Sequence, residues 1–357
     1  MKAAKKMENS KDTKNSFTKK TKQKFSEMPL HKKISKAACF LAVFNKNYNT
    51  SDNKKIYNLN SFQYAAGMAS SFNPELIKAL SATAYLKHCK KCSLSDLDLS
   101  FCVNVSANNQ WVKLKGIYSE DPYLTGQISA DLLKIPELLN IDDFYNPHVI
   151  PEYYWDLGEI SSDSKQQFET NYLPVIKTIS KHSQSFAVNY DGPAEISKEL
   201  IKFFSNLLFE KSDFTGNLFI KLSSVTKETD IHHISEISAF AAKNGCLLAC
   251  GNFDHAIEEA FKSKLISKTV LEKVLNKFIA PEVNADSSAH AYTGEIPAES
   301  AASESIVLLK NDGLVPLAAA NAKKIAVIGP YADFKENFDK GEKNYINKDT
   351  VLNYIIT

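Results

Sequence analysis

The sequence predicts an α/β protein built on a parallel sheet. Short segments rich in Val, Phe, Leu and Cys alternate along the chain with longer segments whose apolar residues recur every three or four positions. The short segments are almost continuously apolar, as expected for strands that are buried on both faces. This alternation is typical of β-α units, in which helices cover a parallel sheet.

The expected elements cover most of the chain. The first long helix has the clearest start, because Asn73 can cap it, Pro74 suits the first helical position and Glu75 is favourable near the positive end of the helix dipole. Strands are expected over residues 36–44, 97–106, 183–190, 216–225 and 245–251, and helices over 73–88, 121–134, 164–180, 197–209, 232–245 and 269–279.

The pattern alone leaves two arrangements open, an open doubly wound sheet and a closed (β/α) barrel. No GxGxxG and no GxxxxGK[ST] motif stands at an expected strand-to-helix turn. The phosphate cradle of a nucleotide-binding sheet is therefore missing from the sequence, and we expect no cofactor.

The charges of the chain nearly cancel. Its 357 residues include 43 basic and 41 acidic ones, and the net charge of +2 favours neither nucleic acid nor an anionic membrane as a partner. Every basic residue is lysine, so the bidentate recognition of carboxylates and phosphates that arginine provides is missing. A polar ligand would have to be bound by Lys, Asn, His and backbone groups.

The N-terminal residues 1–30 are rich in lysine and poor in apolar residues, and we expect a disordered, solvated tail there. The apolar run at 37–44 is too short to span a membrane, and because it lies behind this polar tail it is no signal peptide. We therefore expect a cytoplasmic protein without a membrane partner.

The cysteines give a weak metal signal. Cys89 and Cys92 form a lone CxxC after His88, while Cys246 and Cys250 stand four positions apart. Cys89 falls within an expected helix, and the second pair falls within an expected strand, where buried thiols are common. We expect no bound metal.

The segment AESAASESIVLLKNDGLVPLAAANAKKIAVIGPYAD, residues 298–333, has the character of a boundary between two domains. It indicates an alanine-rich helix, a leucine-valine strand, a turn and then the strand KKIAVIG. Only one further helix, around KDTVLNYII, is expected after it. We therefore expect a first domain over 31–285, a linker over 286–322 and the first β-α unit of a second α/β domain over 323–357.

Three stretches carry a family resemblance. GMASSFNPELIKAL, NNQWVKLKGIYSEDPYLTGQISADLL, and ESIVLLKNDGLVPL with KKIAVIGPYAD together resemble glycoside hydrolase family 3, the β-glucosidase-like enzymes. The resemblance implies a TIM-like (β/α) barrel, complete or incomplete, followed by an α/β sandwich domain. In that family the active site lies between the two domains. Because only the start of the second domain is expected here, the chain looks like a divergent, truncated member.

The resemblance places no catalytic residue in this chain. The family's nucleophilic Asp, in a strand such as GFDGFVVSDW, corresponds by position to Lys221, and no acid stands between Asp213 and Glu228. A retaining glycosidase needs a carboxylate to attack the anomeric carbon, and an ammonium group cannot do this. We expect the site to lack hydrolytic activity.

The same resemblance matches some of the family's substrate-binding positions. Trp111, Glu120 and Asp121 match the family pattern, and Lys113 stands where the family has a sugar-binding Arg. The family's Lys-His-Phe motif corresponds by eye to Asp-Asp-Phe at 142–144. Since the directed hydrogen bonds of these cations would be lost, we expect no measurable binding of monosaccharides, so that any retained role rests on protein contacts.

Three functions stay open from the sequence. The first is a degenerate family member without hydrolytic activity, with a residual sugar-binding or interaction role. The second is a β-glucosidase-type hydrolase whose missing part is a complementary α/β domain on another protein. The third is a non-functional fragment of a decaying gene. The expected partners are a carbohydrate or that complementary α/β domain.

Overall fold

The computed structural model describes residues 27–35, 37, 55–58, 65–89, 97–105, 116–135, 149–155, 161–192, 197–222, 230–249, 253–277, 298–313, 315–316, 326 and 328. The chain divides into two compact units, Met1–Ile306 and Val307–Thr357. The first unit contains every helix and strand for which bounds are given below.

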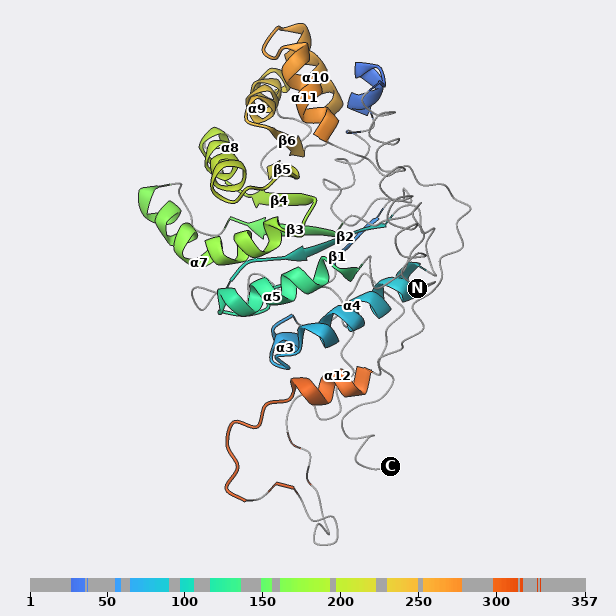
Figure 1. Cartoon of the computed structure of the whole chain (residues 1–357), viewed down its shortest axis with the longest axis vertical. Helices are drawn as coiled ribbons and strands as arrows, with labels where there is room; N and C mark the ends of the chain where they lie inside the picture. The colour runs from blue at the N-terminus through green and yellow to red at the C-terminus, as the bar shows by residue number, and fades with distance from the viewer. Residues whose placement is uncertain are drawn as a thin grey trace, which may run out of the picture. The chain divides into compact units, whose positions relative to one another are not determined.

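The first unit is built on a six-stranded parallel sheet whose strand order follows the sequence (Figure 1). A doubly wound sheet reverses its order at a switch point, and this sheet has no reversal. Consecutive parallel strands joined by right-handed crossovers place all helices on the same face, as in a (β/α) barrel. The strands are β1 (Lys55–Asn58), β2 (Leu97–Cys102), β3 (Val149–Tyr154), β4 (Ser185–Tyr190), β5 (Asn217–Leu222) and β6 (Cys246–Ala249).

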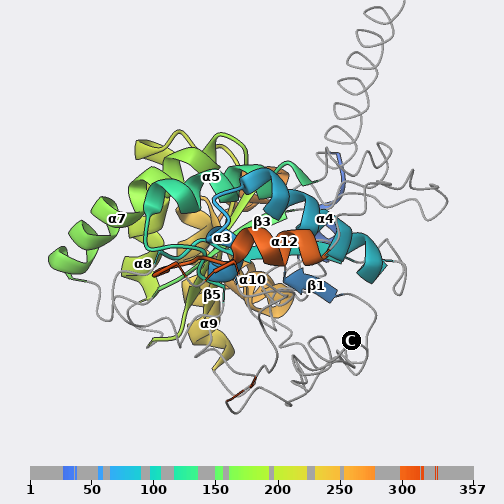
Figure 2. The same ribbon diagram turned by 90° about the horizontal axis from the view of Figure 1, so that it is seen from below.

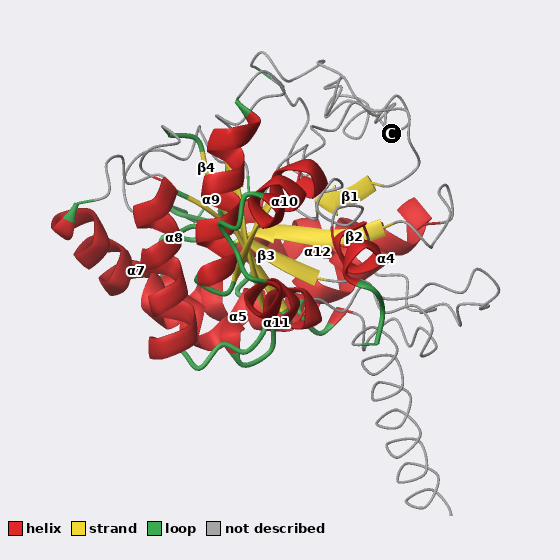
Figure 3. Cartoon of the chain, turned by 90° about the horizontal axis from the view of Figure 1, so that it is seen from above, coloured by secondary structure: helices red, strands yellow, loops and turns green. Residues whose placement is uncertain are grey.

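Helices surround the outer face of this sheet, which is clear in the view from above (Figure 3). Each of the six helices expected between residues 73 and 279 is present, and the helix expected over 197–209 changes to π geometry in its second half. The expected alanine-rich helix is also present, at Ala298–Ser305, and the helix expected around KDTVLNYII lies outside the described residues. The helical elements are α3 (Ala65–Ala69), α4 (Pro74–Cys89), α5 (Pro122–Leu132), α7 (Ser162–Ser180), α8 (Ser197–Ser205), η4 (Asn206–Lys211), α9 (Ile231–Lys243), α10 (Phe253–Lys262), α11 (Lys268–Lys277) and α12 (Ala298–Ser305). No helix in these described ranges combines the length and hydropathy needed to cross a membrane.

Capping side chains fix where several helices begin. The Asp121 carboxylate accepts a hydrogen bond of 2.9 Å from the Tyr123 backbone N–H at the start of α5. Ser161 and Ser164 form a reciprocal capping box at the start of α7. These contacts satisfy backbone donors that the first turn of a helix leaves unpaired.

Two strands, β1 and β3, were not expected from the sequence. β3 contains Pro151, which has no backbone N–H and normally argues against a central strand. The strand is nevertheless paired on both sides, since the Glu152 carbonyl accepts the Val103 N–H at 2.9 Å and the Trp155 N–H donates to the Asn189 carbonyl at 2.9 Å. Pairing on both sides therefore outweighs the single missing donor.

Three strand expectations need correction. Residues 36–44 were expected to begin the sheet, but residues 30–35 and Ala37 are helical, and the rest of that segment lies outside the described residues. The leucine-valine run at 306–309 forms no strand, and its apolar side chains are exposed. Of the strand expected at KKIAVIG, Ala326 and Ile328 are described, and neither is in a strand.

The first unit is held together at both of its ends. Within the N-terminal helical turns, Met28 and Leu30 pack against the core, and the buried Lys33 donates from Nζ to Asn276 Oδ1 of α11 at 2.8 Å. At the other end, α12 lies beside α3 and α4 (Figure 2), where the Ser70 hydroxyl donates to the Ser305 carbonyl at 2.8 Å. The N-terminal segment therefore joins the main core, while Ala301 of α12 packs in a separate small cluster with Leu76 and Leu80 of α4.

An aromatic cluster forms the centre of that core between β3 and helices α7 and α8. Phe168 of α7 is fully buried, and its ring lies against five others. The ring centroids of Tyr153, Trp155, Tyr172, Phe203 and Phe204 lie 4.9 to 6.1 Å from that of Phe168.

We predict that Phe168→Ala lowers the free energy of unfolding by about 3–5 kcal/mol, because it leaves a cavity among these rings. Urea denaturation followed by circular dichroism measures the change. Phe261→Ala on α10 is the matched control, since that ring is 38% exposed and should change stability by no more than about 0.5 kcal/mol. Equal losses in the two variants would contradict the placement of the core.

Candidate functional site

The inner face of the sheet, opposite the helices, carries a row of polar side chains near the C-terminal ends of the strands. Tyr153 packs on Phe168 and Tyr172 of α7, so this side chain marks the outer face of β3. Side chains alternate along a strand, so Glu152 and Tyr154 belong to the inner face. In β/α barrels the C-terminal ends of the strands carry the functional residues.

The strand register aligns one residue from each of four strands at this edge. Tyr154 of β3 pairs with Asn189 of β4, Asn189 pairs with Lys221 of β5, and Lys221 pairs with Ala249 of β6. Paired residues on parallel strands share a face, so these four form what we call the edge row. Glu152 lies one layer below it, in register with Ala187.

Asn104 extends the pairing beyond the end of β2. Its side-chain Nδ2 donates to the Tyr154 carbonyl at 2.6 Å, and its Oδ1 accepts the Tyr154 backbone N–H at 2.8 Å. Asn104 is fully buried. Its amide therefore takes the place of a backbone peptide group and fixes Tyr154, the first member of the edge row.

Glu152 is the acid of this site, and its carboxylate is already held by two donors. Its Oε2 accepts the Tyr154 hydroxyl at 2.8 Å and Asn189 Nδ2 at 3.1 Å. Glu152 and Asn189 are both buried, at 8% and 7% exposed. Hydrogen bonds to a charged acceptor are among the stronger ones, so this network fixes β3 against β4.

Lys221 differs from its neighbours in the edge row. Its side chain is half-buried, whereas Asn189 and Ala249 on either side are buried. It makes no hydrogen bond or ion pair with the residues that the structure describes. The row therefore holds one cation beside a small methyl side chain and an amide.

Of the substrate-binding positions expected from the sequence, the structure describes Glu120 and Asp121. Trp111, Lys113 and the Asp-Asp-Phe at 142–144 lie outside the described residues. Glu120 and Asp121 are exposed at the start of α5, where Asp121 caps the helix. Among these positions, a structural role can be given to Asp121 alone.

Sequence reasoning missed Asn104, Glu152, Tyr154 and Asn189. Asn189 had a visible signal, because it interrupts the apolar strand SQSFAVNY near its C-terminal end. Glu152 and Tyr154 were hidden because Pro151 argued against a strand there. Asn104 looked like an ordinary residue at the end of a strand, and only the structure shows that its amide replaces a peptide group.

Tyr118 is a second unusual group, and it interacts electrostatically with Cys102, the last residue of β2. It is 1% exposed, and its hydroxyl has no hydrogen-bond partner among the described residues. Burial raises the pKa of the Tyr118 phenol, and the charge interaction with the Cys102 thiol adds to the rise. The phenol therefore stays protonated in the folded chain when an exposed tyrosine would ionise.

No group of three or more metal-ligating side chains occurs among the described residues. Cys246 is buried at the start of β6, as its apolar surroundings suggested. Cys89 ends α4, while Cys92 and Cys250 lie outside the described residues. The described part of the chain offers no cluster that could hold a metal ion.

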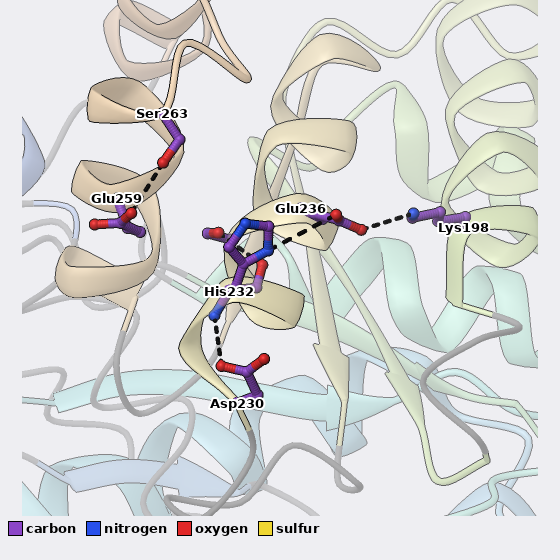
Figure 4. Close-up of polar contacts among 7 residues, drawn as sticks. Lys198, Asp230, His232, Glu236, Glu259 and Ser263 are labelled. Atoms are coloured by element: carbon purple, nitrogen blue, oxygen red, sulfur yellow. Dashed lines mark hydrogen bonds and ion pairs between the residues drawn. The ribbon is translucent and has the colours of Figure 1, made fainter.

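A further polar group lies on the helical surface, away from the sheet (Figure 4). Glu236 of α9 joins His232 one turn earlier, at 3.8 Å, and Lys198 of α8, at 3.6 Å. All three side chains are more than two-fifths exposed. Exposed pairs of this kind contribute about 0–1 kcal/mol, so we assign this group a modest role in joining two helices.

Two curated proteins are similar to the chain in sequence. A xylan 1,4-β-xylosidase from Xylanibacter ruminicola is 26% identical, over 77% of this chain and 37% of that protein. A β-xylosidase from Formosa agariphila is 24% identical, over 77% of this chain and 43% of that protein. The chain thus spans less than half the length of these relatives. No protein-family model matches it.

Solved β-glucosidase structures share the fold. One from Listeria innocua, in complex with isofagomine, gives a TM-score of 0.53 at 12% identity, over 80% of this chain and 50% of that one. One from Erythrobacter marinus gives 0.50 at 14% identity, over 74% and 40%. The chain is therefore a relative of glycoside hydrolases, with a glycosidase-type α/β barrel fold.

We predict that Tyr118→Phe changes how stability depends on pH. Above about pH 10 the phenol ionises in the unfolded chain and stays protonated in the folded one, so each further pH unit costs the wild type about 1.4 kcal/mol. Tyr118→Phe has no phenol at this position, so its free energy of unfolding lacks this fall with pH. Near neutral pH the variant should be at least as stable as the wild type, because it removes an unpaired buried hydroxyl.

Urea denaturation of both proteins near neutral pH and at about pH 10.5 measures the effect, and the difference between them cancels the ionisation of the other tyrosines. A variant that is less stable by more than about 1 kcal/mol near neutral pH would show that the hydroxyl has a partner.

Proposed function

We propose that the chain is a non-hydrolytic relative of the β-glycosidases, in which the inner edge of the barrel binds a carbohydrate without cleaving it. The sequence similarity to β-xylosidases and the fold shared with β-glucosidases support a carbohydrate ligand. The observation that carries the proposal is the position of Lys221 in the edge row, between Asn189 and Ala249.

The chemistry of glycoside hydrolysis argues against cleavage at this row. Retaining enzymes use two carboxyl groups about 5–5.5 Å apart, one as nucleophile and one as acid. In the described part of the edge row and the layer below it, Glu152 supplies a single carboxylate, which already accepts two hydrogen bonds. The resemblance to family 3 assigns the nucleophile position to Lys221.

A lysine there would also oppose the reaction electrostatically. An ammonium about 4 Å from a developing oxocarbenium ion repels it by roughly 4 kcal/mol at an effective dielectric constant near 20, where a carboxylate attracts it by a similar amount. The difference of about 8 kcal/mol corresponds to nearly six orders of magnitude in rate. Loss of the covalent route comes in addition.

A second candidate is a hydrolase that is completed by a further α/β domain. The chain spans 37% and 43% of the two β-xylosidases, so those proteins contain further sequence outside the matched region. Glu152 would then be the barrel's contribution to catalysis. Under either candidate, the proposed partners are a carbohydrate and a complementary α/β domain.

We predict that the purified chain releases no nitrophenol from nitrophenyl β-xyloside, β-glucoside or N-acetyl-β-glucosaminide above the rate in buffer. Glu152→Gln is the matched control, and its melting curve shows whether it folds. Turnover by the wild type that disappears in a folded Glu152→Gln variant would replace this proposal by the hydrolase. Turnover that is equal in both proteins indicates a contaminating enzyme.

A further inference from the structure

We propose that the edge row selects an anionic sugar, a pyranose that carries a carboxylate or a phosphate group, and that the Lys221 ammonium binds this group. This inference rests on the proposed function, because it assumes that the inner edge of the barrel receives a carbohydrate. It adds the chemical class of the ligand and the residue that recognises it.

The environment of Lys221 calls for a negative charge. The side chain stands on the inner face between two buried neighbours and is itself half-buried, so part of its hydration is lost. A partly desolvated charge is stabilised when a counterion or a set of acceptors replaces the lost water. Within the described residues Lys221 has neither an ion pair nor a hydrogen bond.

The acid of the site does not supply that negative charge. Glu152 is on β3 and Lys221 on β5, with β4 between them, so their strands are about 9–10 Å apart at the usual spacing of 4.7–4.9 Å. The Glu152 carboxylate is also occupied by the Tyr154 hydroxyl and the Asn189 amide. Its two donors belong to β3 and β4, and it forms no ion pair with Lys221.

On one side of Lys221 the edge row carries only a small side chain. Ala249 of β6 is the smallest member of the edge row and adds only a methyl group next to the lysine. A ligand anion there would replace no hydrogen bond or ion pair between Lys221 and the described residues. A lysine ammonium is a point charge, so it should bind a carboxylate or a phosphate in the same way.

An ammonium group forms a stronger hydrogen bond with a carboxylate than with a neutral hydroxyl. This difference sets the expected ratio of the affinities for an anionic sugar and for glucose. We expect glucuronate and glucose 6-phosphate to bind at least about ten-fold more tightly than glucose, and added salt to weaken the binding of the two anionic sugars alone. Isothermal titration calorimetry on the full chain measures all three affinities.

Lys221→Gln is the test variant, because it keeps a polar side chain of similar length and removes the charge. It should remove the preference, so that glucuronate and glucose bind the variant with equal affinity. Lys202→Gln is the matched control, because Lys202 is exposed on α8 and should not affect binding. Thermal melting checks that both variants fold.

The outcomes separate this inference from the proposed function. Equal binding of glucose and glucuronate, or a preference that survives Lys221→Gln, overturns the anionic ligand and leaves a neutral sugar site. Hydrolysis of the nitrophenyl glycosides that disappears in a folded Glu152→Gln variant overturns the proposed function whatever the binding data show. Failure of all three sugars to bind overturns the ligand and points to a role in protein contacts.

Discussion

The candidate site depends on the pairing of the Asn104 side chain with the backbone of Tyr154. β2 ends at Cys102, and beyond that point the amide of Asn104 continues the sheet with hydrogen bonds of 2.6 and 2.8 Å. From Tyr154 the connection runs through the Glu152 carboxylate to Asn189 of β4. In the parallel register, Asn189 pairs with Lys221 of β5, so Lys221 lies in the same row. A partly satisfied buried polar network is costly, and none of these side chains is among the buried groups without a hydrogen-bond partner in the described residues.

This arrangement explains how a barrel related to glycosidases can keep its fold while changing its chemistry. The aromatic cluster between β3, α7 and α8 lies on the outer face, and the edge row lies on the inner face, so the two sets of residues can change independently. A lysine in place of a carboxylate affects the charge that a ligand meets, while the packing around Phe168 stays the same. On our proposal, the inner edge favours an anionic ligand and opposes the positive charge that develops during glycoside cleavage.

The sequence predicted the helices well and the site poorly, for physical reasons. Amphipathic periodicity and the capping residue Asn73 are local signals, so the helices followed from them. β3 was missed because Pro151 breaks the local strand pattern, and the strand is stabilised by neighbours that are distant in sequence.

The apolar run at 306–309 looked like a strand, but a strand needs a partner, and none pairs with it among the described residues. The open choice between a doubly wound sheet and a barrel was decided by strand order, which no local pattern contains.

The most direct test of this account is a crystal structure of the chain soaked with glucuronate. The account predicts a sugar at the C-terminal edge of β4 to β6, with a carboxylate oxygen about 2.7–3.0 Å from Lys221 Nζ. It also predicts that the hydrogen bonds of Glu152 to Tyr154 and Asn189 remain in place. A sugar bound elsewhere, or one at this edge whose carboxylate points away from Lys221, would contradict it.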